Sequence, residues 1–138
     1  MFHSRMTRSI PHWLMASMLM GMVACSQAQD PDRVSLEQAR EDLKAGSAVL
    51  IDLREPNEHA RGVAPGAVRL PLSQLSRRWS EVPVDASKPV YLICATQNRS
   101  RAALQALREQ GGYSHLRYVH GGMSGWAAQG WPLSNGVN

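Results

Sequence analysis

The sequence predicts a single α/β domain in which helices cover both faces of a parallel β-sheet. From about residue 34 onward, short apolar runs alternate with segments of helical periodicity. Two of the runs, Ala48–Leu53 and Pro89–Cys94, are almost wholly apolar, which is typical of strands buried on both faces. The length of 138 residues and the hydrophobic share of 43% fit one compact domain rather than two.

The predicted helices are bounded by residues that favour helix ends. Ser35 is a good N-cap residue, and Gly46 and the Gly111-Gly112 pair are typical of helix C-termini. Pro56–Gly62 is polar and turn-rich, with room for one helical turn. The elements follow in this order: a helix between Ser35 and Gly46, strands Ala48–Leu53 and Ala67–Leu70, a helix from Ser73 towards Val82, strand Pro89–Cys94, helix Arg99–Gln110, strand Leu116–Val119, and a short helix around Trp126.

Two polar features fall at the carboxyl ends of the predicted strands, where ligands bind in parallel sheets. One is the segment containing Asp52 and Arg54, and the other is Cys94. Asp52 and Arg54 either support the loop after Cys94 or form an internal ion pair that fixes the turn before Pro56. Cys94 is either a buried structural thiol or a reactive one.

The surroundings of Cys94 favour a reactive thiol. A short loop leads from the strand into a helix, so the backbone N–H groups of Ala95, Thr96, Gln97, Asn98 and Arg99 form a cradle for an anion. Together with the positive end of the helix dipole, these donors stabilise a thiolate. The charge and forked donors of Arg99 are suited to an incoming oxyanion.

The amino-terminal residues are typical of an export signal. Residues 1–9 are basic and polar, and the apolar run of residues 10–24 is shorter than the roughly 20 residues of a membrane-spanning helix. We therefore predict that residues 1–24 are a signal peptide.

The residues before Cys25 resemble a bacterial lipobox, which predicts that Cys25 is lipidated. The alternative is ordinary cleavage after Ala28. Residues 25–33 are then a tether and residues 34–134 the domain, located in the cell envelope on the periplasmic side and touching the membrane only through the lipid. In either case Cys94 is the only free thiol left, which disfavours a disulfide between Cys25 and Cys94.

Charge and histidine spacing argue against several kinds of partner. The formal charge is +4, but without the first 24 residues 13 basic residues face 11 acidic ones, and the basic residues form no run with interleaved aromatics. The sequence therefore does not indicate nucleic-acid binding. His59, His115 and His120 lack metal-ligand spacing, so neither a metal nor a cofactor is indicated.

Three ordered motifs resemble the rhodanese family over about residues 34–133. They are the segments from Val49 to Ala67, from Tyr91 to Ser100, and from Gly121 to Leu133. The resemblance implies a rhodanese-like fold and a sulfurtransferase that moves sulfane sulfur from a donor such as thiosulfate, through a persulfide on Cys94, to cyanide, a small thiol or a protein thiol. Four residues separate Cys94 from Arg99, whereas related phosphatases have five, so the loop favours sulfur over phosphate.

Two positions depart from the family pattern. Gln97 stands where many members have Gly, so a left-handed backbone there would cost about 1 kcal/mol or more, and the side chain would decorate the pocket mouth. Val63 stands where the family usually has His, at a site that we interpret as structural. The alternatives to a sulfurtransferase are a non-catalytic rhodanese-like module that binds a partner or senses redox state, and a thiol oxidoreductase, for which a second Cys is not available as resolving partner.

Overall fold

The computed structural model describes residues 29–135, together with Met1. The predicted signal peptide and Cys25 lie outside the described residues. Among those residues, no helix has the length and apolar character needed to cross a membrane. In chain order, the elements are β1 (Arg33–Val34), α1 (Leu36–Ala45), β2 (Val49–Asp52), α2 (Pro56–His59), β3 (Val68–Arg69), α3 (Leu72–Arg78), the 3-10 turn η1 (Trp79–Glu81), β4 (Val90–Ile93), α4 (Asn98–Gln110), β5 (Leu116–Val119) and α5 (Gly122–Ala128).

Within residues 29–135 the sheet has five strands in the order β1-β5-β4-β2-β3, and all of their pairs are parallel. The predicted fold class is therefore confirmed. The two central strands, β2 and β4, run in register, with Asp52 beside Ile93 at their carboxyl ends. The chain segments that follow these two residues therefore lie side by side at the carboxyl-terminal end of the sheet.

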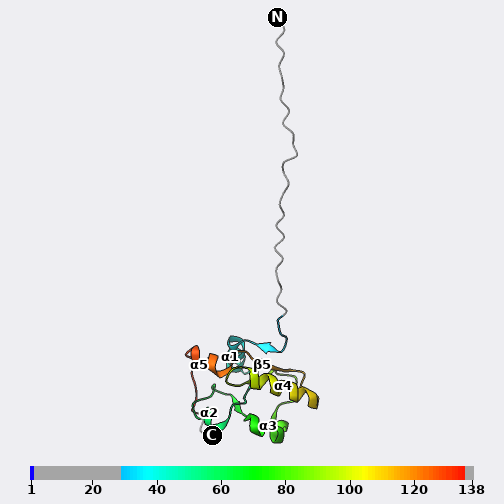
Figure 1. Ribbon diagram of the computed structural model, residues 1–138, viewed down its shortest axis with the longest axis vertical. Coiled ribbons are helices and arrows are strands. Elements are labelled where there is room, and N and C mark those ends of the chain that lie inside the picture. Colours follow the sequence, from blue (N-terminus) through cyan, green and yellow to red (C-terminus); the bar gives the residue numbers. More distant parts are fainter. Residues whose placement is uncertain (2–28, 136–138) are drawn as a thin grey trace.

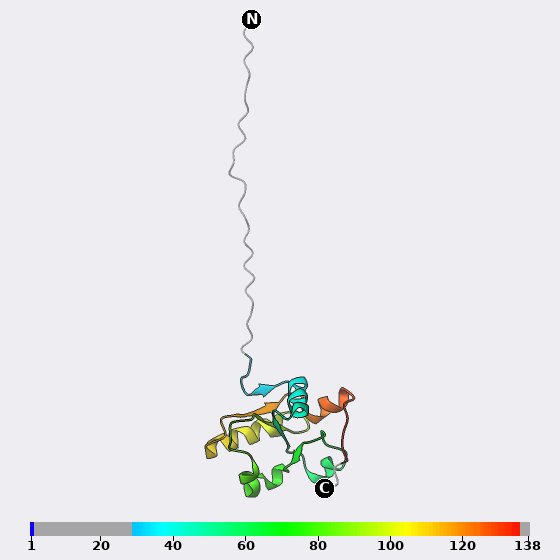
Figure 2. The same cartoon turned by 180° about the vertical axis from the view of Figure 1, so that it is seen from behind.

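Helices cover both faces of the sheet. On one face, α3 and α4 pack their buried residues Leu75, Leu104 and Leu107 against the strands. On the other face, α1 and α5 contribute Ala39 and Trp126. Figure 1 shows α3 and α4 on one side of the molecule and α1 beside α5 on the other, and the reverse view in Figure 2 shows the same pairing of α1 with α5.

The caps of the first helix are confirmed. The Ser35 side chain accepts a hydrogen bond from the backbone N–H of Gln38, and Gly46 ends α1 with a φ of 68°. The third helix begins at Leu72 rather than Ser73 and tightens into η1 at Trp79. The fourth strand ends at Ile93, so Cys94 is the first residue beyond it.

The start of the domain differs from the prediction, because residues 30–33 pack against it although they were predicted to be tether. Arg33 belongs to β1, the edge strand beside β5. The Tyr118 hydroxyl donates to Asp30 at 2.8 Å, and Arg108 forms an ion pair with Asp32. A two-residue strand has no recognisable periodicity, which is why the sequence did not indicate it.

Candidate active site

Cys94 lies at the carboxyl end of β4, at the start of a loop that leads directly into α4. Its side chain is only 1% exposed. The end of β4 is fixed by the residue after β2, since the N–H of Leu53 donates to the carbonyl of Ile93 at 2.8 Å. The Cys94 thiol donates to the hydroxyl of Ser100 at 3.5 Å, and this hydroxyl donates to the carbonyl of Gln97 at 3.0 Å. The sulfur is therefore held in a defined position beside the first turn of the helix.

The loop and the first turn of α4 leave their backbone donors free. Within the described part of the chain, the N–H groups of residues 95–100 have no acceptor, and the first N–H that has one is that of Arg101, which donates to Gln97. A helix start with unfilled donors attracts anions through those donors and through the helix dipole. The predicted cradle of residues 95–99 is therefore structurally available.

The loop is pinned through its carbonyl groups by the start of α5. The N–H of Met123 donates to the carbonyl of Cys94 at 2.8 Å, and the N–H of Ser124 donates to the carbonyl of Ala95 at 2.9 Å. Gly122, the residue before Met123, has a φ of +57°, and a Cβ there would lie 2.6 Å from the Ala95 oxygen. Because the carbonyls of Cys94 and Ala95 point towards α5, the N–H groups of the same peptide units point away from α5.

The left-handed backbone that would strain Gln97 does not occur. Gln97 has a φ of −158°, and no residue other than glycine has a positive φ among the described residues. Nor is its side chain free to decorate the pocket mouth, because Oε1 accepts a hydrogen bond from the N–H of Gly121 at 3.1 Å. Gln97 therefore ties the loop to the start of α5.

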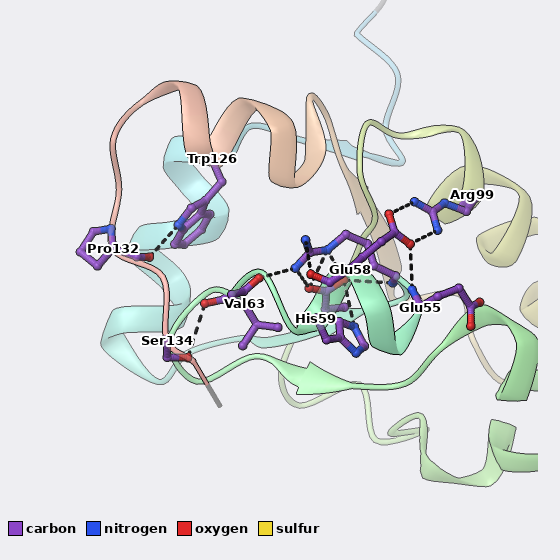
Figure 3. A network of polar contacts seen from close by, with 11 residues as sticks. Glu55, Glu58, His59, Val63, Arg99, Trp126, Pro132 and Ser134 are labelled. Carbon is purple, nitrogen blue, oxygen red and sulfur yellow. Dashed lines mark hydrogen bonds and ion pairs between the residues drawn. The ribbon is translucent and has the colours of Figure 1, made fainter. Parts of the chain in front are cut away.

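Arg99 does not point freely into the cradle as predicted. Its guanidinium forms a two-pronged ion pair with Glu58, with both N–O distances 2.7 Å (Figure 3). The ion pair with Arg99 lowers the pKa of Glu58 to about 2, and the same bond raises the pKa of Arg99. Glu58 also accepts from the N–H of Glu55, which closes the capping box of α2. The charge of Arg99 is thus largely balanced by a carboxylate.

Asp52 and Arg54 form the internal ion pair that was one of the two interpretations. Asp52 is fully buried, Arg54 is 7% exposed, and their closest N–O distance is 2.6 Å. The Arg54 guanidinium also donates to the carbonyl of Gly62 at 2.8 Å. His59 is buried beside them, with Nε2 3.5 Å from Asp52 and no hydrogen-bond partner among the described residues. Asp52 and Arg54 therefore fix the turn that carries Glu58.

A cavity of about 300 Å³ opens beside the loop. Its lining includes Ala95, residues of α5, and the charged residues Arg54, Glu58 and Arg61. Within the part of the chain that the structure describes, no cluster of three or more His, Cys, Asp or Glu side chains is arranged to hold a metal ion. The arrangement is thus a buried sulfur, an open set of N–H donors and an adjoining cavity of mixed polarity.

Comparison with known proteins identifies the family. The family model described as the rhodanese-like domain matches residues 35–129. This chain belongs to the rhodanese family. The rhodanese chain is 37% identical over 118 residues to the uncharacterized protein YqhL of Bacillus subtilis, which covers 84% of this chain and 90% of that protein. It is 35% identical over 102 residues to a sulfurtransferase of Allochromatium vinosum, covering 74% of this chain and 91% of that protein.

Solved structures of rhodanese-related proteins also match this chain. A rhodanese-related protein from Thermoplasma volcanium matches the rhodanese chain with a TM-score of 0.66 at 29% identity, over 75% of this chain and 98% of that one. The human single-domain sulfurtransferase TSTD1 matches with a TM-score of 0.59 at 28% identity, over 72% of this chain and 98% of that one. These relatives support a sulfurtransferase-type function.

Two contributors to the rhodanese site were not assigned a role from the sequence: Ser100 and Glu58. Ser100 is fully buried, and its position one turn into a helix from the loop was a usable signal. Glu58 acts through its contact with Arg99, which is distant in sequence, so no local pattern revealed it. By contrast, Val63 is 2% exposed and bonds to Ser134, as its structural interpretation requires (Figure 3).

Proposed function

We propose that this rhodanese domain is a sulfurtransferase that carries sulfane sulfur as a persulfide on Cys94. The observation that carries the proposal is the Cys94 sulfur beside unfilled N–H donors at the start of a 13-residue helix. Such donors stabilise the negative charge that both the thiolate and the persulfide bear. Among the described residues Cys94 is the free cysteine, so it has no resolving partner there.

The reaction has two displacements. The Cys94 thiolate attacks the outer sulfur of thiosulfate, the S–S bond of thiosulfate breaks with its electron pair going to sulfite, and a persulfide anion remains on Sγ. A thiophilic acceptor, cyanide or a thiolate, then attacks the outer sulfur. The Sγ–S bond breaks, its electron pair returns to Sγ, and the thiolate is regenerated, with no net oxidation of the protein.

Ser100 has a defined part in this cycle. In the thiol form its hydroxyl accepts from Sγ and donates to Gln97. When the sulfur is a thiolate it can no longer donate, and the hydroxyl proton turns from the Gln97 carbonyl to Sγ. The hydroxyl therefore adds one hydrogen bond to the anionic form of the sulfur.

Mass spectrometry tests the proposal. After incubation with thiosulfate and removal of the excess, the intact protein should be heavier by one sulfur atom, and cyanide should reverse the change with release of thiocyanate. Cys94→Ser should show neither event. If the wild-type protein gains no sulfur from any sulfane donor, the domain is a binding module and the proposal fails.

We also propose that the protein is exported to the periplasmic side of the cell envelope and anchored through lipidated Cys25. The basic start and the short apolar run before Cys25 support this proposal. Mass spectrometry of the protein isolated from the envelope tests it. A diacylated amino-terminal Cys25 is expected, whereas a chain that begins at Gln29 would show ordinary cleavage after Ala28.

A further inference from the structure

A separate cavity of about 530 Å³ lies beside the edge strand β3. Neither Cys94 nor residues 95–100 belong to its lining. The ionisable residues that line it are His59, Arg69 and Arg78, and within the described part of the chain its lining contains no acidic residue. A cavity whose ionisable residues are all basic favours an anionic ligand.

The two arginines of this cavity differ in whether their charge is balanced. The Nε and Nη2 groups of Arg78 donate to the two carboxylate oxygens of Glu81, at 2.7 and 2.8 Å. Arg69 is half-buried, and no carboxylate of the described residues lies within 4.0 Å of its guanidinium. The cavity therefore carries one unbalanced positive charge, which belongs to Arg69.

Two further hydrogen-bond donors on the lining residues lack an acceptor among the described residues. The N–H of Leu70 donates to the carbonyl of Asp52 at 3.0 Å, so the backbone N–H of Arg69, which alternates with it, points away from β2 to the unpaired side of β3. The Oε1 atom of Gln74 accepts from Arg78 at 2.7 Å, which leaves the NH₂ group of the amide as a donor. The positive charge of Arg69 is thus accompanied by neutral donors.

We propose that this cavity binds a small organic acid, whose carboxylate pairs with Arg69 and accepts a hydrogen bond from the Gln74 amide. One carboxylate balances the one unbalanced charge, and its two oxygens match the fork of a guanidinium. Pro56, Ala60 and Pro71 give the lining an apolar part that the carbon body of the acid contacts. The volume lies in the range of small-molecule sites, about 300–1,000 Å³. Because the loop after β4 does not line the cavity, binding does not depend on the proposed sulfur transfer.

Titration of the isotope-labelled protein with benzoate, followed by NMR, tests the proposal. Benzoate should shift the backbone N–H signal of Arg69 and the side-chain NH₂ signals of Gln74, and the dissociation constant follows from these shifts. Benzamide has the same ring without the charge, so it should bind about tenfold more weakly, the weight of one charge-assisted hydrogen bond. Inorganic phosphate, which lacks a carbon body, should also bind more weakly than benzoate.

A matched pair of variants gives the second measurement. Arg69→Gln should weaken benzoate binding about tenfold. The control Arg77→Gln removes an exposed charge of α3 that does not line the cavity, and it should leave the affinity unchanged. If Arg69→Gln does not fold, the comparison of benzoate with benzamide on the wild-type protein still decides.

Several results would overturn the inference. They are an absence of shifts, equal affinities for benzoate and benzamide or for benzoate and phosphate, equal benzoate binding by wild-type and Arg69→Gln protein, and an equal loss in Arg77→Gln. Shifts confined to the N–H groups of residues 95–100 would also overturn it, because they would place the anion at the Cys94 loop. Failure of the wild-type protein to load sulfur would instead overturn the proposed function alone, since the titration requires no sulfur.

Discussion

The two central strands end side by side, but the segments that follow them differ in whether their polar groups are paired. After β2, the charges of Asp52 and Arg54 are buried and satisfied by each other and by the carbonyl of Gly62. After β4, the carbonyls of Cys94 and Ala95 are bonded to α5, while the N–H groups of residues 95–100 have no acceptor in the described chain.

The difference separates a supporting region from a reacting one. Buried polar groups in folded proteins are nearly always paired, so a satisfied pair needs no ligand to explain it. A row of unpaired donors at a helix start is most stable when an anion fills it. We therefore expect changes to the buried pair Asp52–Arg54 to act on stability, and changes that displace the loop donors or release Arg99 to act on the handling of anions.

The largest effect should come from Asp52→Asn. The substitution leaves the buried guanidinium of Arg54 without its counter-charge, which costs about 3–5 kcal/mol of unfolding free energy. The midpoint of urea unfolding measures it. Glu41→Gln is the control, because the exposed pair with Lys44 has an N–O distance of 3.7 Å and should contribute about 0.5 kcal/mol or less. Equal midpoints for the two variants would refute the distinction.

Gly122→Ala should come next. A methyl group there would meet the carbonyl oxygens of Thr96, Cys94 and Ala95, so the loop must move, at a cost of about 2–4 kcal/mol with the strain of the positive φ included. Gly130→Ala is the matched control, since its φ is +67° but nothing lies within 4 Å of its Cβ position. Gly122→Ala should lose sulfur loading from thiosulfate while Gly130→Ala keeps it. Similar loading by both variants would mean that the packing of α5 does not shape the loop.

Glu58→Gln should release Arg99 and raise the rate of sulfur loading from thiosulfate about tenfold, as one charge-assisted hydrogen bond becomes available to the donor. Gln can still accept from the N–H of Glu55, so the cap of α2 is kept. Glu81→Gln, which breaks the exposed pair with Arg78, is the control. An unchanged loading rate in Glu58→Gln would show that Arg99 takes no part in donor binding.

The Glu58–Arg99 ion pair predicts a pH dependence of the folding stability. Arg99 lowers the pKa of Glu58 from its ordinary 4.5 to about 2, so the ionised carboxylate stabilises the folded state. Its contribution is complete above pH 4.5 and is lost as the pH falls through about 2. The stability difference between the wild-type protein and Glu58→Gln should therefore shrink across this window. Urea midpoints that differ by a constant amount would contradict it.

The smallest effect should come from Gln97→Ala. It removes the acceptor of the Gly121 N–H and costs about 1 kcal/mol. Hydrogen exchange of that N–H should become faster. Gln97→Glu keeps an acceptor oxygen and should retain the protection, whereas loss of protection in both variants would assign the effect to the loop backbone instead.

Most of the fold could be predicted from the sequence because its signals are local. Apolar runs gave β2 and β4, and Ser35 with Gly46 gave the ends of α1. The edge strand β1 was missed because two residues carry no periodicity, and its stability comes from pairing with β5, which is distant in sequence.

The site was predictable only in part, for the same reason. The position of Cys94 and its free N–H cradle follow from a strand, a short loop and a helix that are adjacent in sequence. The engagement of Arg99 by Glu58 and the bond from Gly121 to Gln97 join residues 41 and 24 positions apart. Side-chain partners of this kind become visible only once the fold brings them together.

The contacts of Asp30 and Asp32 also determine which way the site faces. Arg108, the partner of Asp32, lies near the end of α4 opposite Cys94, and the helical rise over the ten positions that separate it from Asn98 is about 15 Å. The chain thus enters the domain at the end opposite to that of the Cys94 sulfur. For a protein held at its amino-terminal end, as we propose, this geometry turns the Cys94 loop away from the anchoring surface and towards molecules arriving from the surrounding medium.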